Sequence, residues 1–92
     1  MENASITELH NYGRQLLNEK KVKEAMAVFE KNYTKNNGAW PTNAGMMRGY
    51  SAMGDLKKAL EFGRKAMAQA PSPEIKKIIE QAVSTLESGK PL

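Results

Sequence analysis

The chain has 92 residues with 14 Lys or Arg, 10 Asp or Glu and no Cys, which gives a formal net charge of +4 at pH 7. A chain of this length buries about two-thirds of the surface that it exposes when unfolded. That is enough for a single domain, residues 1–92, and excludes a catalytic domain joined to a cofactor domain. The absence of Cys excludes disulfides, thiolate metal sites and thiol nucleophiles.

The first two predicted helices form a hairpin. Ser5 and Glu8 have the spacing of a capping box, so the first helix should begin near Ile6. Apolar residues then recur at intervals of three and four, which lines one helical face. A second helix is predicted over about residues 22–33, and the Asn-Asn-Gly run at residues 36–38 should end it because these residues tolerate a left-handed backbone.

The next two predicted helices form a second hairpin. Pro41 suits a first helical turn, so a third helix is predicted over about residues 40–53. Gly54 can end that helix, and Asp55 can cap the following one directly. A fourth helix over about residues 56–69 therefore turns straight back on the third.

A fifth helix is predicted near the end of the sequence. Ser72 is placed to cap it, Pro73 fits its first position, and Gly89 should end it. Its predicted apolar stripe consists of Ile75, Ile78, Ile79, Ala82 and Leu86. No segment shows the alternation of a β-strand, so the predicted fold class is all-α.

The two hairpins, residues 5–38 and 40–71, repeat each other. They superpose at a period of 34 residues without a gap. The matched pairs include Arg14 with Arg48, Leu16 with Tyr50, Ala25 with Ala59, and Lys31 with Lys65. Small residues recur where two helices must approach closely, and we expect them to lie in the helix seams. They are Gly13, Ala25, Gly45, Gly49, Ala59 and Ala66.

This pattern resembles the tetratricopeptide repeat family, whose 34-residue unit is a helix–turn–helix with small, aromatic, Gly and Pro residues at fixed places. The matching residues are Gly13, Leu16, Ala25 and Phe29 in the first unit and Tyr50, Gly54, Ala59, Ala66 and Pro71 in the second. Asn32 replaces an expected Ala, while Met47 and Gly63 replace a small and an aromatic residue. The resemblance implies a right-handed α–α superhelix, or solenoid, of two hairpins with a capping helix over residues 72–89.

A narrower likeness concerns residues 8–14, 39–41 and 48–55. These stretches look like the C-terminal tail of a bacterial protein family of unknown function, in which the tail follows a separate N-terminal domain. This likeness implies that the chain is such a tail, and it adds no chemistry.

The sequence gives little support for catalysis. His10 is the one histidine, so neither a Ser-His-Asp triad nor a multi-histidine metal site can be assembled. Glutamates are instead spaced for helix pairing, Glu19 with Lys23 and Glu61 with Lys65. We therefore expect no enzymatic activity, no catalytic residues, no metal and no cofactor.

Protein or peptide binding is the function that the resemblance implies, because first helices of such repeats line a concave groove. The candidate peptide-binding residues are His10, Arg14, Leu17, Asn18, Ala44, Arg48, Ser51, Lys76 and Glu80. Arg14 and Arg48 hold the same place in successive units, and two guanidinium groups can hold carboxylates bidentately. The expected partner is a peptide with acidic side chains or a free C-terminal carboxylate. Alternatively, both arginines pair with Glu8, Glu80 or solvent.

Two other functions remain open from the sequence. Two and a half repeats leave apolar end faces, so the chain can instead be a homodimerising or tethering tail of a larger protein. The Met-rich third helix suits either core filling or such an interface. Nucleic-acid contact ranks third, because the densest basic group is judged to lack interleaved aromatics for base stacking; it consists of Lys57, Lys58, Arg64 and Lys65. With no secretory signal or apolar span of about eighteen residues, the default expectation is a cytoplasmic protein without membrane contact.

Overall fold

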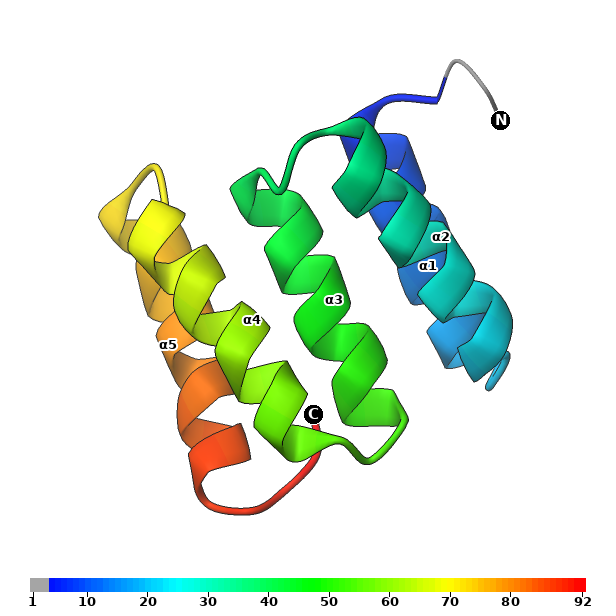
Figure 1. The fold of residues 1–92 in the computed structure, drawn as a ribbon. Coiled ribbons are helices and arrows are strands. Elements are labelled where there is room, and N and C mark those ends of the chain that lie inside the picture. Colours follow the sequence, from blue (N-terminus) through cyan, green and yellow to red (C-terminus); the bar gives the residue numbers. More distant parts are fainter. Residues whose placement is uncertain (1–3) are drawn as a thin grey trace.

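The computed structural model describes residues 4–92. The expectation that the sequence begins without a secretory signal concerns in part the three preceding residues, which lie outside this range. Five α-helices follow one another along the described chain (Figure 1). They are α1 (Ile6–Asn18), α2 (Val22–Lys35), α3 (Trp40–Ala52), α4 (Leu56–Gln69) and α5 (Pro73–Glu87). No strand occurs among the described residues, so the predicted all-α class is confirmed. The radius of gyration is 12.1 Å, close to the value of about 12 Å expected when all the helices pack together.

Local sequence signals set the helix starts. The Ser5 hydroxyl accepts from the Glu8 N–H at 3.1 Å, and the Glu8 carboxylate accepts from the Ser5 N–H at 3.0 Å, which is the predicted capping box. Asp55 and Ser72 each accept from a backbone N–H in the first turn of α4 and α5. These caps satisfy amide groups that the first helical turn leaves free.

The predicted helix ends are correct to within about two residues. Helix α2 continues to Lys35 and stops where Asn37 and Gly38 adopt positive φ angles of 54° and 66°. Gly54, with a φ of 84°, reverses the chain between α3 and α4. A residue without a side chain is favoured at such angles, and the tight turn places α4 antiparallel to α3.

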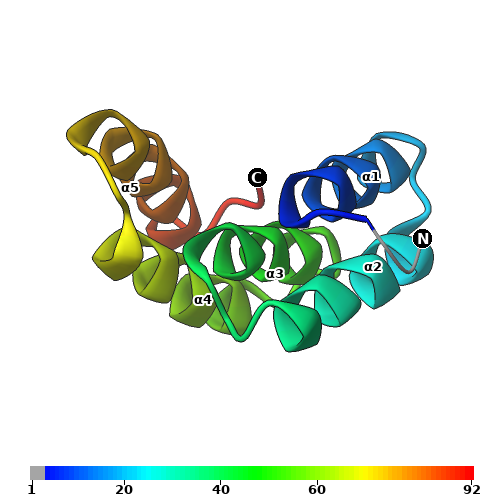
Figure 2. The same ribbon diagram turned by 90° about the horizontal axis from the view of Figure 1, so that it is seen from above.

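The helices pack in sequence, each against the next, and α1 also packs against α3. Viewed from above, the layer curves (Figure 2). Helices α2 and α4 lie on its outer side, while α1 and α5 rise on either side of α3 and enclose a concave face. The C-terminal end of the chain enters this concave space between α1 and α5.

The core forms on both sides of α3. Phe29, which is 1% exposed, centres one cluster, and Met47, also 1% exposed, centres the other. A Cβ atom added at Gly13 or Gly45 would overlap the Phe29 ring, and one added at Gly49 would overlap the Met26 side chain. The expected role of these small residues is therefore confirmed at the α1–α2 and α2–α3 seams.

Met47 and Gly63, the two residues of the second unit that depart from the repeat pattern, compensate each other in volume. A Cβ atom added at Gly63 would lie 2.9 Å from both the Met47 sulfur and a Val83 methyl group. Met47 thus fills the volume that an aromatic residue at position 63 would take. Of the three methionines in and beside α3, Met46 also lies in the core, whereas Met53 is 56% exposed.

The face that α5 buries differs in part from the predicted stripe. Ile79 and Leu86 lie in the core as expected, but Val83, which is not part of the predicted stripe, is buried with them at 4% exposure. Ile78 is 60% exposed, so its placement on the core stripe was wrong. Helix α5 is rotated so that Ile78 and Ala82 face the concave side.

Candidate functional site

Two adjoining hollows lie on the concave face. The first, which we call the arginine hollow, has a volume of about 280 Å³ and is lined by Arg14, Leu17, Asn18, Arg48, Ala52 and Leu92. The second, the apolar hollow, has a volume of about 170 Å³. It is lined by His10, Arg14, Trp40, Ala44, Met47, Arg48, Ile75, Ile78, Ile79 and Ala82. Arg14 and Arg48 line both hollows, so one continuous groove runs past the two guanidinium groups.

Among residues 4–92, Arg48 is a half-buried cation without an ion-pair partner. Its Nε atom is buried and makes no hydrogen bond to any described residue. Burial, and then the nearby charge of Arg14, lower the pKa of the Arg48 guanidinium. A guanidinium nevertheless stays protonated at neutral pH, and a cation held out of water without a counter-charge is costly. The site therefore favours an anion at this point.

Arg14, on α1, lines the same two hollows and is also without an acidic partner in the part of the chain that the structure describes. The ion pairs within residues 4–92 involve other side chains. Glu8 is engaged by Ser5 in the α1 cap, and Glu80 is exposed on α5 without an ion pair. Pairing of Arg14 and Arg48 with Glu8 or Glu80 is therefore not formed among the described residues, and pairing with solvent stays a prediction.

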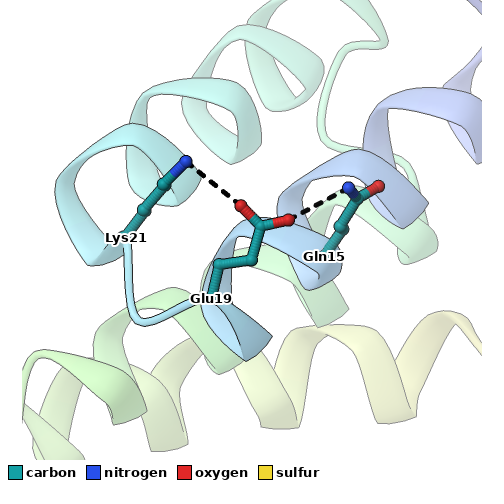
Figure 3. A network of polar contacts seen from close by, with 3 residues as sticks. All are labelled: Gln15, Glu19 and Lys21. Carbon is teal, nitrogen blue, oxygen red and sulfur yellow. Dashed lines mark hydrogen bonds and ion pairs between the residues drawn. The ribbon is translucent and has the colours of Figure 1, made fainter.

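Glu19 pairs locally, at the turn between α1 and α2. Its carboxylate lies 3.2 Å from the Lys21 ammonium and accepts from the Gln15 amide at 3.1 Å (Figure 3). The Gln15 hydrogen bond, followed by the Lys21 contact, lowers the pKa of Glu19. The predicted pairing with Lys23 is wrong because Glu19 is the C-cap of α1, so the two residues do not share a helix.

The second predicted pair, Glu61 with Lys65, is also not formed. The Lys65 ammonium lies 4.8 Å from the centroid of the Phe62 ring instead. Both Lys65 and Glu61 are exposed on α4. An exposed ion pair contributes little, so contact with an aromatic face competes with it.

His10 is held neutral beside the two arginines. Burial, followed by the charges of Arg14 and Arg48, lowers its pKa to about 4, while the backbone carbonyl of Pro41 acts in the opposite direction. The His10 Nδ1 atom is buried and has no hydrogen-bond partner among the described residues. A neutral imidazole here lines the groove without adding a third positive charge.

The apolar hollow continues the groove toward α5. Trp40 forms part of its wall, Ile75 and Ile78 rise from α5, and Ile78 is 60% exposed. Neither hollow is lined by an acidic residue from the described part of the chain. The groove thus offers two cations and a neutral imidazole next to an apolar surface, an arrangement that can hold a carboxylate beside an aliphatic or aromatic side chain.

The structure brings together most of the predicted site residues. His10, Arg14, Leu17, Asn18, Ala44 and Arg48 line the hollows, and Ser51 lies beside them, hydrogen-bonded to Leu92. Lys76 and Glu80 are exposed on α5 and line neither hollow. Apolar residues of α5 take the positions facing the groove, because the helix is rotated relative to the repeat alignment.

Several groove residues were missed from the sequence. They are Trp40, Met47, Ile75, Ile78, Ile79, Ala82 and Leu92. The apolar stripe of α5 was visible, but which of its edges faces the core depends on packing against α4. Nothing local indicates that Leu92 contacts Ser51, 41 positions earlier.

An aromatic cluster lies between α2, α3 and α4. The Phe62 ring stacks on Tyr50 at 5.5 Å between centroids and meets Tyr33 edge-on at 5.8 Å. Lys58 lies 5.3 Å from the Tyr50 ring centroid. Aromatic residues therefore do accompany the basic residues of α4, contrary to the expectation from the sequence, but they are packed against one another.

Comparisons with known protein families, with characterised proteins and with solved structures gave no match to this chain. Within the described range, no cluster of three or more His, Cys, Asp or Glu residues could hold a metal ion. None of the helices there has both the length and the apolar character needed to cross a membrane.

Proposed function

We propose that this chain is a non-enzymatic protein-interaction module of tetratricopeptide-like architecture, which binds an acidic peptide segment in its concave groove. The observation that carries the proposal is the half-buried, unpartnered guanidinium of Arg48 beside Arg14. The 34-residue sequence period and the concave side formed by α1, α3 and α5 support the architecture.

A carboxylate between the two guanidinium groups would offset their mutual repulsion. Arginine presents a planar fork of donors that matches a carboxylate, and such charge-assisted bonds are among the stronger hydrogen bonds. The groove is short, so the interface is small and micromolar affinity is expected.

Calorimetry with a matched pair of peptides tests the proposal. One blocked peptide alternates glutamate and leucine, and its control alternates glutamine and leucine. The wild type should bind the first and bind the second much more weakly. The double variant Arg14→Ala, Arg48→Ala should lose at least tenfold in affinity for the glutamate peptide.

A second double variant controls for net charge. The double variant Lys31→Ala, Lys57→Ala also removes two positive charges, but from exposed sites that line neither hollow. It should bind the glutamate peptide nearly as the wild type does. Equal losses in both double variants would reveal a general charge effect and refute the proposed site.

Self-association is a second candidate function, supported by the exposed Ile78 on the last helix and by Met53. Apolar side chains of this size are more than half exposed here, and a second copy of the chain could cover them. Light scattering over a range of concentrations tests this candidate. A species that stays monomeric at the highest concentration excludes it.

A further inference from the structure

The segment after α5 folds back into the groove. Gly89, with a φ of 86°, turns the chain beyond α5, and the Lys90 N–H donates to the Thr85 carbonyl at 3.3 Å. Pro91 follows, and the segment then runs into the concave space between α1 and α5 (Figure 2). It therefore reaches the candidate site from within the same chain.

The contacts of Leu92 are those that an extended ligand would make. Its backbone N–H donates to the Ser51 hydroxyl at 2.7 Å, and Ser51 is only 2% exposed. The Leu92 side chain lines the arginine hollow together with Leu17 and Ala52, and the residue remains 45% exposed. The buried Ser51 hydroxyl thus accepts a hydrogen bond from the main chain, while the aliphatic Leu92 side chain lies against the apolar residues of the hollow.

This occupancy leaves the cationic part of the site unsatisfied. Between Ser88 and Leu92 the one charged side chain is that of Lys90, so this segment has no side-chain carboxylate to pair with the arginines. Within the described chain no ion pair joins this segment to Arg14 or Arg48. The segment therefore makes the backbone and apolar contacts of the site but forms no ion pair with either arginine.

We propose that residues 90–92 occupy, within their own chain, the site where an extended segment of a partner protein binds, and that this partner segment carries an aliphatic side chain next to a carboxylate. The inference rests on the proposed function and specifies its ligand. The Ser51 hydroxyl accepts a hydrogen bond from a backbone N–H of the partner segment. Its aliphatic side chain packs against Leu17 and Ala52, and its carboxylate pairs with the two arginines. Because the partner adds the contact that residues 90–92 lack, it displaces them.

Crosslinking tests the occupancy without any ligand. The natural chain has no Cys, so introduced thiols react on a clean background. In the double variant Ala52→Cys, Leu92→Cys, both thiols lie at the same hollow. Mild oxidation should form an intramolecular disulfide, detected by mass spectrometry. The control pairs Leu92→Cys with Thr34→Cys, which lines a separate depression on α2, and should not crosslink. Equal crosslinking of the two pairs, or none in the first, overturns the occupancy.

Peptide affinity tests the competition. Deleting residues 90–92 removes no part of a helix, and circular dichroism checks that the fold is kept. If the segment fills the site for about 70–90% of the time, the deletion should tighten binding of the glutamate–leucine peptide by about three- to tenfold. The oxidised Ala52→Cys, Leu92→Cys variant should bind that peptide at least tenfold more weakly than its reduced form.

The outcomes separate this inference from the proposed function. If the deletion variant and the wild type bind the peptide equally, the displacement is refuted while the peptide-binding function stands. If the peptide binds to neither protein, the proposed function is refuted and the partner chemistry inferred here fails with it. In that case a positive crosslink still shows that residues 90–92 occupy the hollow.

Discussion

The ring of Phe29 in α2 fills the space that a side chain at Gly13 in α1 would need. Both residues are buried, and Phe29 is 1% exposed. A glycine inside a helix costs up to about 1 kcal/mol relative to alanine, so the close approach of the ring must offset that cost. The packing of α1 against α2 therefore depends on the Phe29 ring lying against a residue that has no side chain.

Gly13→Ala should lower the free energy of unfolding by about 1–3 kcal/mol, because the new methyl group overlaps a ring that is fixed in the core. Urea denaturation measures the loss. The double variant Gly13→Ala, Phe29→Leu should lose less than the sum of its single variants, since the smaller side chain leaves room for the methyl group. Strict additivity would show that the two residues are not coupled.

Asn32→Ala restores the residue expected from the repeat pattern and should nevertheless destabilise the protein. Asn32 is fully buried, and its amide donates to the Ile6 carbonyl at 3.1 Å while its oxygen accepts from Asn36 at 2.7 Å. Leaving such buried groups without partners costs about 1–3 kcal/mol. The matched variant Asn11→Ala, at an exposed site in α1, should change stability by less than about 0.5 kcal/mol. Thermal or urea unfolding of both variants checks the difference.

The pH dependence of stability should contain a contribution from His10. Its pKa is about 4 in the folded protein and 6.5 as the ordinary value, so the unfolded chain binds the proton more readily between these limits. Stability from this residue is complete above pH 6.5 and decreases as the pH falls toward 4. Urea unfolding of the wild type and of His10→Gln at several pH values isolates the effect. An imidazole that titrates near pH 6.5 by NMR would contradict it.

Arg48→Met should raise stability and reduce binding at once. The substitution keeps a long side chain and removes a half-buried charge that has no partner, which should add about 0.5–2 kcal/mol to the free energy of unfolding. The same variant should bind the glutamate–leucine peptide several-fold more weakly. Arg64→Met is the control, because Arg64 is exposed, pairs with Glu87 at 3.1 Å and lines neither hollow. It should change neither quantity appreciably.

Features that depend on neighbouring residues were predictable from the sequence. The capping box of Ser5 and Glu8, the Asp55 cap and the reversal at Gly54 all use side chains within a few positions of the backbone that they organise. The expectation that Arg14 and Arg48 lie in a groove came from the resemblance to tetratricopeptide repeats, in which both residues hold the same place in successive units.

Features that depend on tertiary packing were not predictable in this way. Whether Ile78 or Val83 faces the core is decided by how α5 rotates against α4, and both residues fit an apolar stripe. The choice of Lys21 over Lys23 by Glu19 depends on where α1 ends to within a residue. The return of Leu92 to Ser51 is a long-range contact with no local signal.

Trp40, the chain's one tryptophan, forms part of the wall of the apolar hollow. Its indole is therefore a built-in optical reporter, whose emission wavelength and quenching by iodide should respond when the groove fills. Occupancy can be followed in the unlabelled protein at concentrations too low for calorimetry, including in the variant that lacks residues 90–92.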